Sequence, residues 1–111
     1  MTLSLDAALQ RHTIARRQHA AALKELAATE RANLRAICPI ATSSIRDRIA
    51  ETRRALDAAE AELAAAPART VWAFLIKVET LAEETMTPEA AALLRRDASA
   101  LLDQQSRSAA A

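Results

Sequence analysis

Glycine is absent from all 111 residues of this sequence, and proline occurs only three times. A chain without glycine lacks the usual residue for helix C-caps and for tight hairpin turns, and it has no glycine-rich loop to cradle a phosphate. Pro39, Pro67 and Pro88 are therefore its main interruptions. They divide the chain into four stretches that favour helix, and this predicts an all-α fold.

Helix-start residues and the prolines together set the expected bounds. Ser4 or Thr2 is the N-cap expected for the first helix, Ser44 in "SIRD" begins the second, and Thr70 caps the third. Thr87, directly before a proline, caps the fourth. The predicted helices cover residues of about 4–37, 44–66, 70–85 and 88–106, and the tail beyond them is expected to fray.

The first two helices carry apolar residues at coiled-coil spacing. In the second helix, spacings of four and three alternate over Ile45, Ile49, Thr52, Leu56, Ala59, Leu63 and Ala66. In the first helix, a less regular seam is expected at Ala20, Leu23, Ala27, Leu34 and Ile37. A short connector between them predicts a long antiparallel hairpin. With the shorter helical pair that follows, residues 1–111 are expected to form a single domain with a four-helix arrangement.

The segment "PARTVWAFLIKVETL", residues 67–81, holds the only Trp and the only Phe. At 100° per residue, a stripe about 120° wide is expected to face the core. The stripe contains Val71, Phe74, Leu75, Val78, Leu81 and Ala82. Lys77 is expected on the polar side, near Glu84. Trp72 and Ile76 fall outside the stripe, so either the hairpin and fourth helix cover them or they belong to an interface with another protein or a second copy.

Residues able to carry chemistry are few. His12 and His19 are seven apart, which separates them by roughly 10.5 Å along a helix, too far to share one metal ion. Glu79 and Glu83 are one turn apart, but the Glu-x-x-His pattern of di-metal bundles is missing. Cys38, the only cysteine, is expected to be a small buried residue at the hairpin turn. We therefore expect no metal, no cofactor and no catalytic site.

A basic stretch lies in the first helix, where residues 7–24 contain no acidic residue. Its basic residues are Arg11, Arg16, Arg17 and Lys24. They form either a solvated face, a face neutralised by Glu60 and Glu62 of the second helix, or a contact for nucleic acid. The net charge of +1 gives no overall polyanion-binding signature.

The longest apolar run, residues 71–76, is far shorter than the roughly 20 residues that span a bilayer. The first residues also lack a basic-then-apolar leader. We therefore expect a cytoplasmic protein with no membrane partner.

The third and fourth helices together resemble a loose group of short, Ala/Arg-rich bacterial proteins of unassigned function. The group shares a Pro-Ala-x-Thr start, a lysine about seven residues after the threonine, and a closing Leu-Leu helix with an aspartate. The matching residues here are Pro67, Ala68, Thr70, Lys77, Leu93, Leu94 and Asp97. The group usually carries Gly where this chain has Ala73 or Phe74. The resemblance implies a prophage or mobile-element setting and no particular activity.

The function that these patterns favour is non-enzymatic protein–protein association. We expect a small helical adaptor, assembly or anti-defence protein of a bacterial mobile element or phage, which binds another protein, itself as a homodimer, or both. Trp72 and Ile76 are the predicted partner-binding residues. The alternative is a nucleic-acid-associated accessory protein that uses the basic residues of the first helix.

Overall fold

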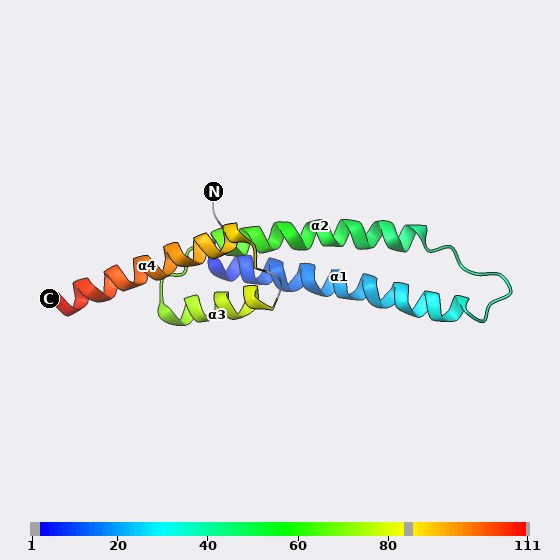
Figure 1. Ribbon diagram of the computed structural model, residues 1–111, viewed down its shortest axis with the longest axis horizontal. Coiled ribbons are helices and arrows are strands. Elements are labelled where there is room, and N and C mark those ends of the chain that lie inside the picture. The colour runs from blue at the N-terminus through cyan, green and yellow to red at the C-terminus, as the bar shows by residue number, and fades with distance from the viewer. Residues whose placement is uncertain (1–2, 84–85, 111) are drawn as a thin grey trace. The chain divides into compact units, whose positions relative to one another are not determined.

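A computed structural model describes residues 3–83 and 86–110, with side chains described through residue 107. This part of the chain contains four α-helices and no strand (Figure 1). They are α1 (Leu5–Asn33), α2 (Ser43–Ala65), α3 (Val71–Ala82) and α4 (Pro88–Ala110). The predicted all-α, four-helix fold is confirmed.

The helix starts follow from the capping residues. Ser4, Thr70 and Thr87 each accept a hydrogen bond from the backbone N–H three residues later, at 3.3, 3.1 and 3.1 Å. These bonds satisfy N–H groups that have no partner within the helix. The start of α2 lies at Ser43, one residue before the predicted position. The other N-cap considered for the first helix, Thr2, lies outside the described residues.

Three helix ends differ clearly from the prediction. The first helix stops at Asn33 instead of residue 37, because the Asn33 side chain bonds to the backbone of the following loop. The last helix continues to Ala110 instead of fraying after residue 106. Its end contains no helix breaker, and alanine has the highest intrinsic helix propensity. The third helix, predicted to end at residue 85, ends at Ala82 with Glu83 as its C-cap, and the predicted end lies outside the described residues.

The chain divides into two compact units, which are described separately below. Unit 1 comprises Met1–Leu9 and Glu60–Ala111, and unit 2 comprises Gln10–Ala59. Residues of α1 and α2 therefore belong to both units, whereas α3 and α4 belong to unit 1 alone.

Unit 2 is an antiparallel hairpin of α1 and α2 (Figure 1). An exposed ion pair links Glu30 to Arg46 at 2.7 Å, and His19 Nδ1 lies 3.0 Å from Thr52 Oγ1. The seam predicted for the second helix is confirmed, since all seven of its residues are buried or half-buried. Those in unit 2 are Ile45, Ile49, Thr52, Leu56 and Ala59.

The seam predicted for the first helix is wrong. Its five residues, Ala20, Leu23, Ala27, Leu34 and Ile37, are all exposed. The residues of α1 that are buried or half-buried in unit 2 include a series with alternating spacings of three and four, namely His12, Ala15, His19, Ala22, Leu26, Thr29 and Asn33. The pattern of large apolar residues does not mark this series, because four of its members are polar and two are alanine. Both histidines thus occupy seam positions.

The loop between α1 and α2 is closed by one side chain. Asn33 Nδ2 donates to the carbonyl oxygen of Ile40 at 2.9 Å, and the Ile40 N–H donates to Asn33 Oδ1 at 2.8 Å. The loop exposes Leu34, Ile37 and Ile40, with Ile37 99% exposed. Cys38 is exposed as well, so its predicted burial at the turn is wrong.

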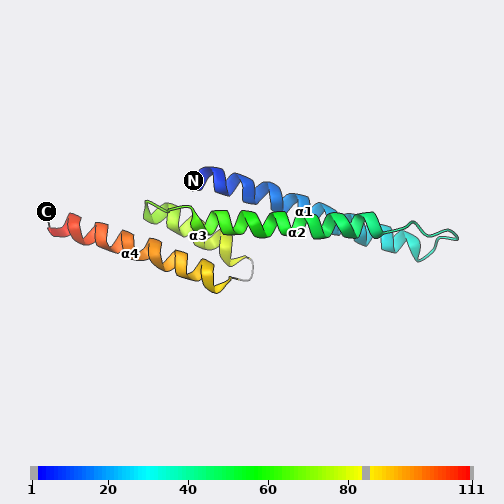
Figure 2. The ribbon, with the colours of Figure 1, turned by 90° about the horizontal axis from the view of Figure 1, so that it is seen from above.

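Unit 1 has its own apolar core. Figure 2 shows α3 and α4 running antiparallel to each other. The buried residues of this core are Ala8, Leu63, Ala64, Ala66, Leu81 and Leu94. Phe74, Val78 and Leu93 pack against them and are partly buried. Half of the buried residues are alanine, so backbones approach closely here and large side chains contribute only a thin layer.

Asn33→Ala is predicted to loosen the hairpin loop. The substitution removes both hydrogen bonds to Ile40, and because the site is exposed we expect a loss of about 1 kcal/mol in the free energy of unfolding. Hydrogen exchange measured by NMR should show a faster rate for the Ile40 amide. Ser44→Ala, in the same region, is the control and should change neither quantity. An equally protected Ile40 amide in Asn33→Ala would contradict this account of the loop.

Candidate functional site

A lysine lies in the core of unit 1. The side chain of Lys77 is fully buried, and Nζ donates a hydrogen bond of 2.5 Å to Asp97 Oδ2 on α4. It also donates to the carbonyl oxygen of Ala66 at 2.7 Å. The Asp97 side chain is only 4% exposed. The prediction that Lys77 lies on the polar side of its helix is therefore wrong, and Glu84, its expected neighbour, lies outside the described residues.

The end of α2 explains why a cation is buried here. The last carbonyl groups of a helix have no partner within it, and they carry the negative end of the helix dipole. A glycine in the left-handed conformation usually ends such a helix, but this chain has no glycine. Pro67 stops the helix without providing an N–H donor. Lys77 provides the missing donor to Ala66 from another helix.

Arg96 completes the arrangement. Its guanidinium donates to Asp97 Oδ1 at 2.9 and 3.3 Å and makes a weaker contact of 3.4 Å to the carbonyl oxygen of Ala65. Asp97 thus accepts hydrogen bonds from two cations, one buried and one half exposed. We call Lys77, Asp97, Arg96 and the two carbonyl groups the Lys77 cluster. It joins the C-terminus of α2 to α3 and α4.

The Lys77 cluster determines which face of α3 is exposed. Trp72 precedes Lys77 by five residues, so their side chains point about 140° apart around the helix. When Lys77 faces the core, Trp72 faces away from it, and it is 74% exposed. Val71 is 61% and Leu75 49% exposed, so their predicted place in the core is wrong. Of the predicted stripe, Leu81 alone is buried.

The exposed face of α3 is the candidate binding surface. We call Val71, Trp72, Leu75 and the half-buried Ile76 the α3 strip. At 100° per residue these four residues span about 140° of the helix. The exposed Glu79 lies within the same arc, one turn beyond Leu75. Of the two predicted partner-binding residues, Trp72 is the most exposed member of the strip and Ile76 is the least exposed.

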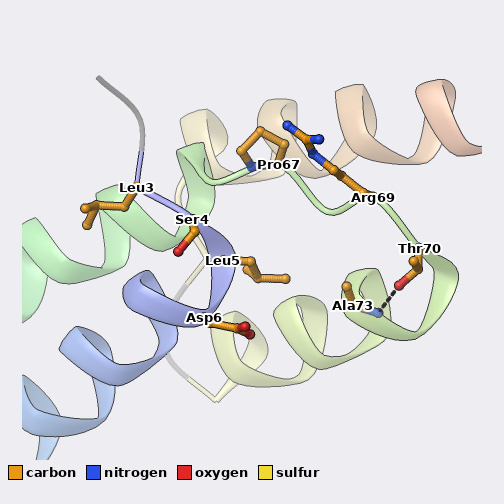
Figure 3. Close-up of a pocket in the computed structure, with 8 residues that line it drawn as sticks. All are labelled: Leu3, Ser4, Leu5, Asp6, Pro67, Arg69, Thr70 and Ala73. Carbon is orange, nitrogen blue, oxygen red and sulfur yellow. Dashed lines mark hydrogen bonds between the residues drawn. The ribbon is translucent and has the colours of Figure 1, made fainter.

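An open cavity of about 530 Å³ lies in unit 1, between the first residues of α1 and the start of α3 (Figure 3). Its lining includes the N-cap residues Ser4 and Thr70 together with Asp6 and Arg69. Each cap hydroxyl already accepts a backbone hydrogen bond from its own helix. One backbone N–H group at each helix start is therefore already satisfied within the chain.

The second cavity, of about 480 Å³, lies on the side of the hairpin in unit 2. It is lined by His19, Leu23, Leu26, Arg46, Ile49, Ala50 and Arg53. Both arginines are already engaged in ion pairs, Arg46 with Glu30 and Arg53 with Asp57. The cavity is therefore a shallow apolar surface whose charges are largely compensated.

The four basic residues considered for nucleic acid are all exposed on α1 in unit 2. Arg17 and Lys24 are seven residues apart and share one face of the helix. Arg16 lies within about 100° of both, so these three residues occupy one side of the helix, whereas Arg11 lies about 120–140° from each of them. The structure therefore places three of the four charges on one side of α1 and the fourth, Arg11, apart from them.

The described residues contain no group of three or more His, Cys, Asp or Glu side chains placed to hold a metal ion. His12 is buried in the seam, and His19 is engaged with Thr52. None of the described helices has both the length and the apolarity that a membrane span requires.

Comparison with protein-family models, with curated proteins and with solved structures finds no match to this chain. The seven residues that carry the resemblance noted above all belong to unit 1. They include both partners of the buried ion pair, Lys77 and Asp97. Thr70 caps α3, and Ala68 and Leu94 are buried. Sequence reasoning named these residues but missed their contact. The sequence signal for this contact is a helix that stops just before Pro67 with no glycine to cap its C-terminus.

Lys77→Met is predicted to destabilise the protein strongly. It leaves the buried Asp97 with Arg96 alone and removes the donor to Ala66, so we expect a loss of about 3 kcal/mol in the free energy of unfolding. Replacing both partners, as Lys77→Met with Asp97→Leu, should recover part of the loss, because the Ala66 carbonyl is then the buried group that lacks its partner, while the half-exposed Arg96, which also loses Asp97, can be hydrated. Urea denaturation at a fixed protein concentration measures all three free energies.

Arg48→Met is the control for this series. It breaks the ion pair with Glu25, which is about half exposed, and we expect a loss below about 1 kcal/mol. Equal losses for Arg48→Met and Lys77→Met, or a double variant less stable than Lys77→Met, would show that the Lys77 cluster is not the critical contact of unit 1.

Proposed function

We propose that this protein acts by binding another protein chain through the α3 strip, without catalysis. The observation that carries the proposal is the exposure of Trp72, at 74%, on a helix whose opposite face is held by a buried ion pair. Trp72 projects from a fixed helix and not from a loop.

Physical considerations favour a binding role for such a surface. Apolar side chains exposed side by side gain free energy when a partner covers them. Tryptophan is enriched among the residues that dominate binding energy at protein interfaces. The buried residues Lys77 and Leu81 fix the opposite face of α3, so the helix presents these side chains in one orientation. Less conformational entropy is then lost on association.

The setting of this activity is part of the proposal. We propose a small adaptor or assembly protein, in the mobile-element or anti-defence context that the resemblance implies. A cytoplasmic location is favoured by the free, exposed thiol of Cys38, since such thiols persist in reducing compartments. The nucleic-acid alternative has less support, because only three of its four basic residues share one side of α1 and the net charge is only +1.

Trp72→Glu is predicted to weaken binding at least tenfold while leaving the fold intact, because it places a charge in the centre of the α3 strip. Tagged wild-type and variant proteins are compared for self-association by light scattering and for capture of other proteins from a lysate of the source cells. Circular dichroism checks that each variant keeps its helix content.

Leu102→Glu is the matched control for this comparison. Leu102 lies on α4 in the same unit and is 64% exposed, so its replacement makes the same chemical change away from the strip. We expect it to bind like the wild type. Undiminished binding by Trp72→Glu would contradict the proposed function. Unfolding of Trp72→Glu would show that Trp72 belongs to the core, which also contradicts it.

A further inference from the structure

We infer that the loop between α1 and α2 attaches this protein to the surface of an anionic lipid membrane. The loop belongs to unit 2, so its role is separate from that of the α3 strip in unit 1 and goes beyond the protein binding proposed above. The expectation of no membrane partner rested on the lack of a spanning segment and of a leader. Attachment to one leaflet needs neither of them.

The loop carries apolar side chains that face solvent at the end of the hairpin (Figure 1). We call residues 34–40 the hairpin tip. Its large apolar residues are Leu34, Ile37 and Ile40, and all three are exposed, Ile37 almost completely. Single exposed apolar side chains are ordinary on protein surfaces. Three of them in one short loop gain free energy together when an apolar environment covers them.

The Asn33 side chain holds the hairpin tip in place. Its two hydrogen bonds to the backbone of Ile40 tie the end of α1 to the end of the tip. The N–H groups of Arg35 and Ala36 donate to carbonyl groups of the last turn of α1. Several backbone groups of the loop are thus satisfied without water. Those that are not keep the tip at the boundary between head groups and acyl chains and out of the bilayer centre.

The charges around the hairpin tip fit an anionic surface. Residues 31–46 contain three arginines and no acidic residue. One of them, Arg46, is paired with Glu30. Among the described residues, the guanidinium groups of Arg31 and Arg35 have no hydrogen-bond or ion-pair partner, and both are exposed. Basic side chains next to an inserted apolar tip lie at the level of the lipid phosphates, where each adds to the attraction.

The side chains of the tip favour lipid over a protein partner. Residues 36–41, with the sequence AICPIA, carry no charged, hydroxyl, amide or aromatic side chain. Protein interfaces rely on aromatic and arginine anchors and on directed hydrogen bonds around them. Hydrocarbon needs no directed contact, so aliphatic side chains suit it. The α3 strip, which holds the only Trp of the chain, has the protein-binding chemistry that the hairpin tip lacks.

Vesicle co-sedimentation tests the apolar contact. The wild type should bind vesicles of phosphatidylcholine mixed with phosphatidylglycerol, and it should bind pure phosphatidylcholine much more weakly. Ile37→Asp should weaken binding to the mixed vesicles about tenfold or more, because it removes the most exposed apolar side chain of the tip. Ile14→Asp is the matched control, since Ile14 is also exposed but lies on α1 far from the tip.

A charge reversal tests the anionic preference in the same assay. Arg35→Glu should weaken binding to the mixed vesicles about tenfold at low salt, because an attracted charge is replaced by a repelled one. Raising the salt concentration should weaken wild-type binding as well. Arg54→Glu makes the same change in net charge at an exposed position of α2 away from the tip, and it should bind nearly as well as the wild type.

A fluorophore on Cys38 reports insertion directly, because this exposed residue of the tip is the only cysteine of the chain. The emission of an environment-sensitive dye attached there should shift to the blue when mixed vesicles are added. The same dye attached through Ala58→Cys, in a chain that also carries Cys38→Ala, should not shift. Ala58 is exposed on α2, away from the tip.

A wild type that binds neither kind of vesicle overturns the inference, and a tip-dependent complex with another protein would then identify the other class of partner. Vesicle binding that survives Ile37→Asp, or that is abolished by Trp72→Glu, also overturns it, because the hairpin tip is then not the contact. Equal binding to both kinds of vesicle, or none of the expected loss in Arg35→Glu, overturns the anionic preference. Trp72→Glu should otherwise bind vesicles like the wild type, so failure of the proposed function leaves this test unaffected.

Discussion

The buried ion pair between Lys77 and Asp97 is the contact on which unit 1 depends. A chain without glycine lacks the most common C-cap residue for α2, and Pro67 stops the helix while supplying no donor. Lys77 supplies that donor from α3, and Asp97 on α4 neutralises the buried cation. One side chain therefore satisfies the end of one helix and fixes the positions of two others. Breaking a buried pair by removing one partner costs far more than breaking an exposed one, so this contact specifies the packing of a core that is otherwise rich in alanine.

The same contact links the fold to the proposed function. A helix as apolar as α3 could turn several faces towards a core, and its apolar residues alone favour burying Val71 and Leu75. Placing Lys77 in the core turns the helix, and the exposed residues become those that a partner can cover. In the proposed complex, burial of Trp72 by the partner would recover the free energy that its exposure costs in the free chain. The proposed binding surface and the core lie on two sides of one short helix.

Much of the fold was predictable from local signals. Capping residues and prolines located the four helices, and the seam of α2 follows from alternating spacings of apolar residues. The seam of α1 was not predictable in this way, because polar residues such as His12, His19 and Asn33 occupy positions that an apolar pattern does not mark. The rotation of α3 was also missed, since hydrophobicity places a lysine outside the core. Assigning Lys77 to the surface fails because the C-terminus of α2 needs a hydrogen-bond donor. That need arises only when α2 and α3 pack together, so the sequence of α3 alone does not show it.

The most direct test of this account is the accessibility of Trp72 in the folded monomer. Trp72 is the only tryptophan of the chain, so its fluorescence reports on one position of α3. At a concentration low enough to keep the protein monomeric, acrylamide should quench the native emission almost as efficiently as that of the protein unfolded in urea, and the emission maximum should lie close to that of the unfolded chain. Strong protection from acrylamide with a blue-shifted maximum in the monomer would place Trp72 in the core. It would contradict the claim that Lys77 turns this face of α3 outward.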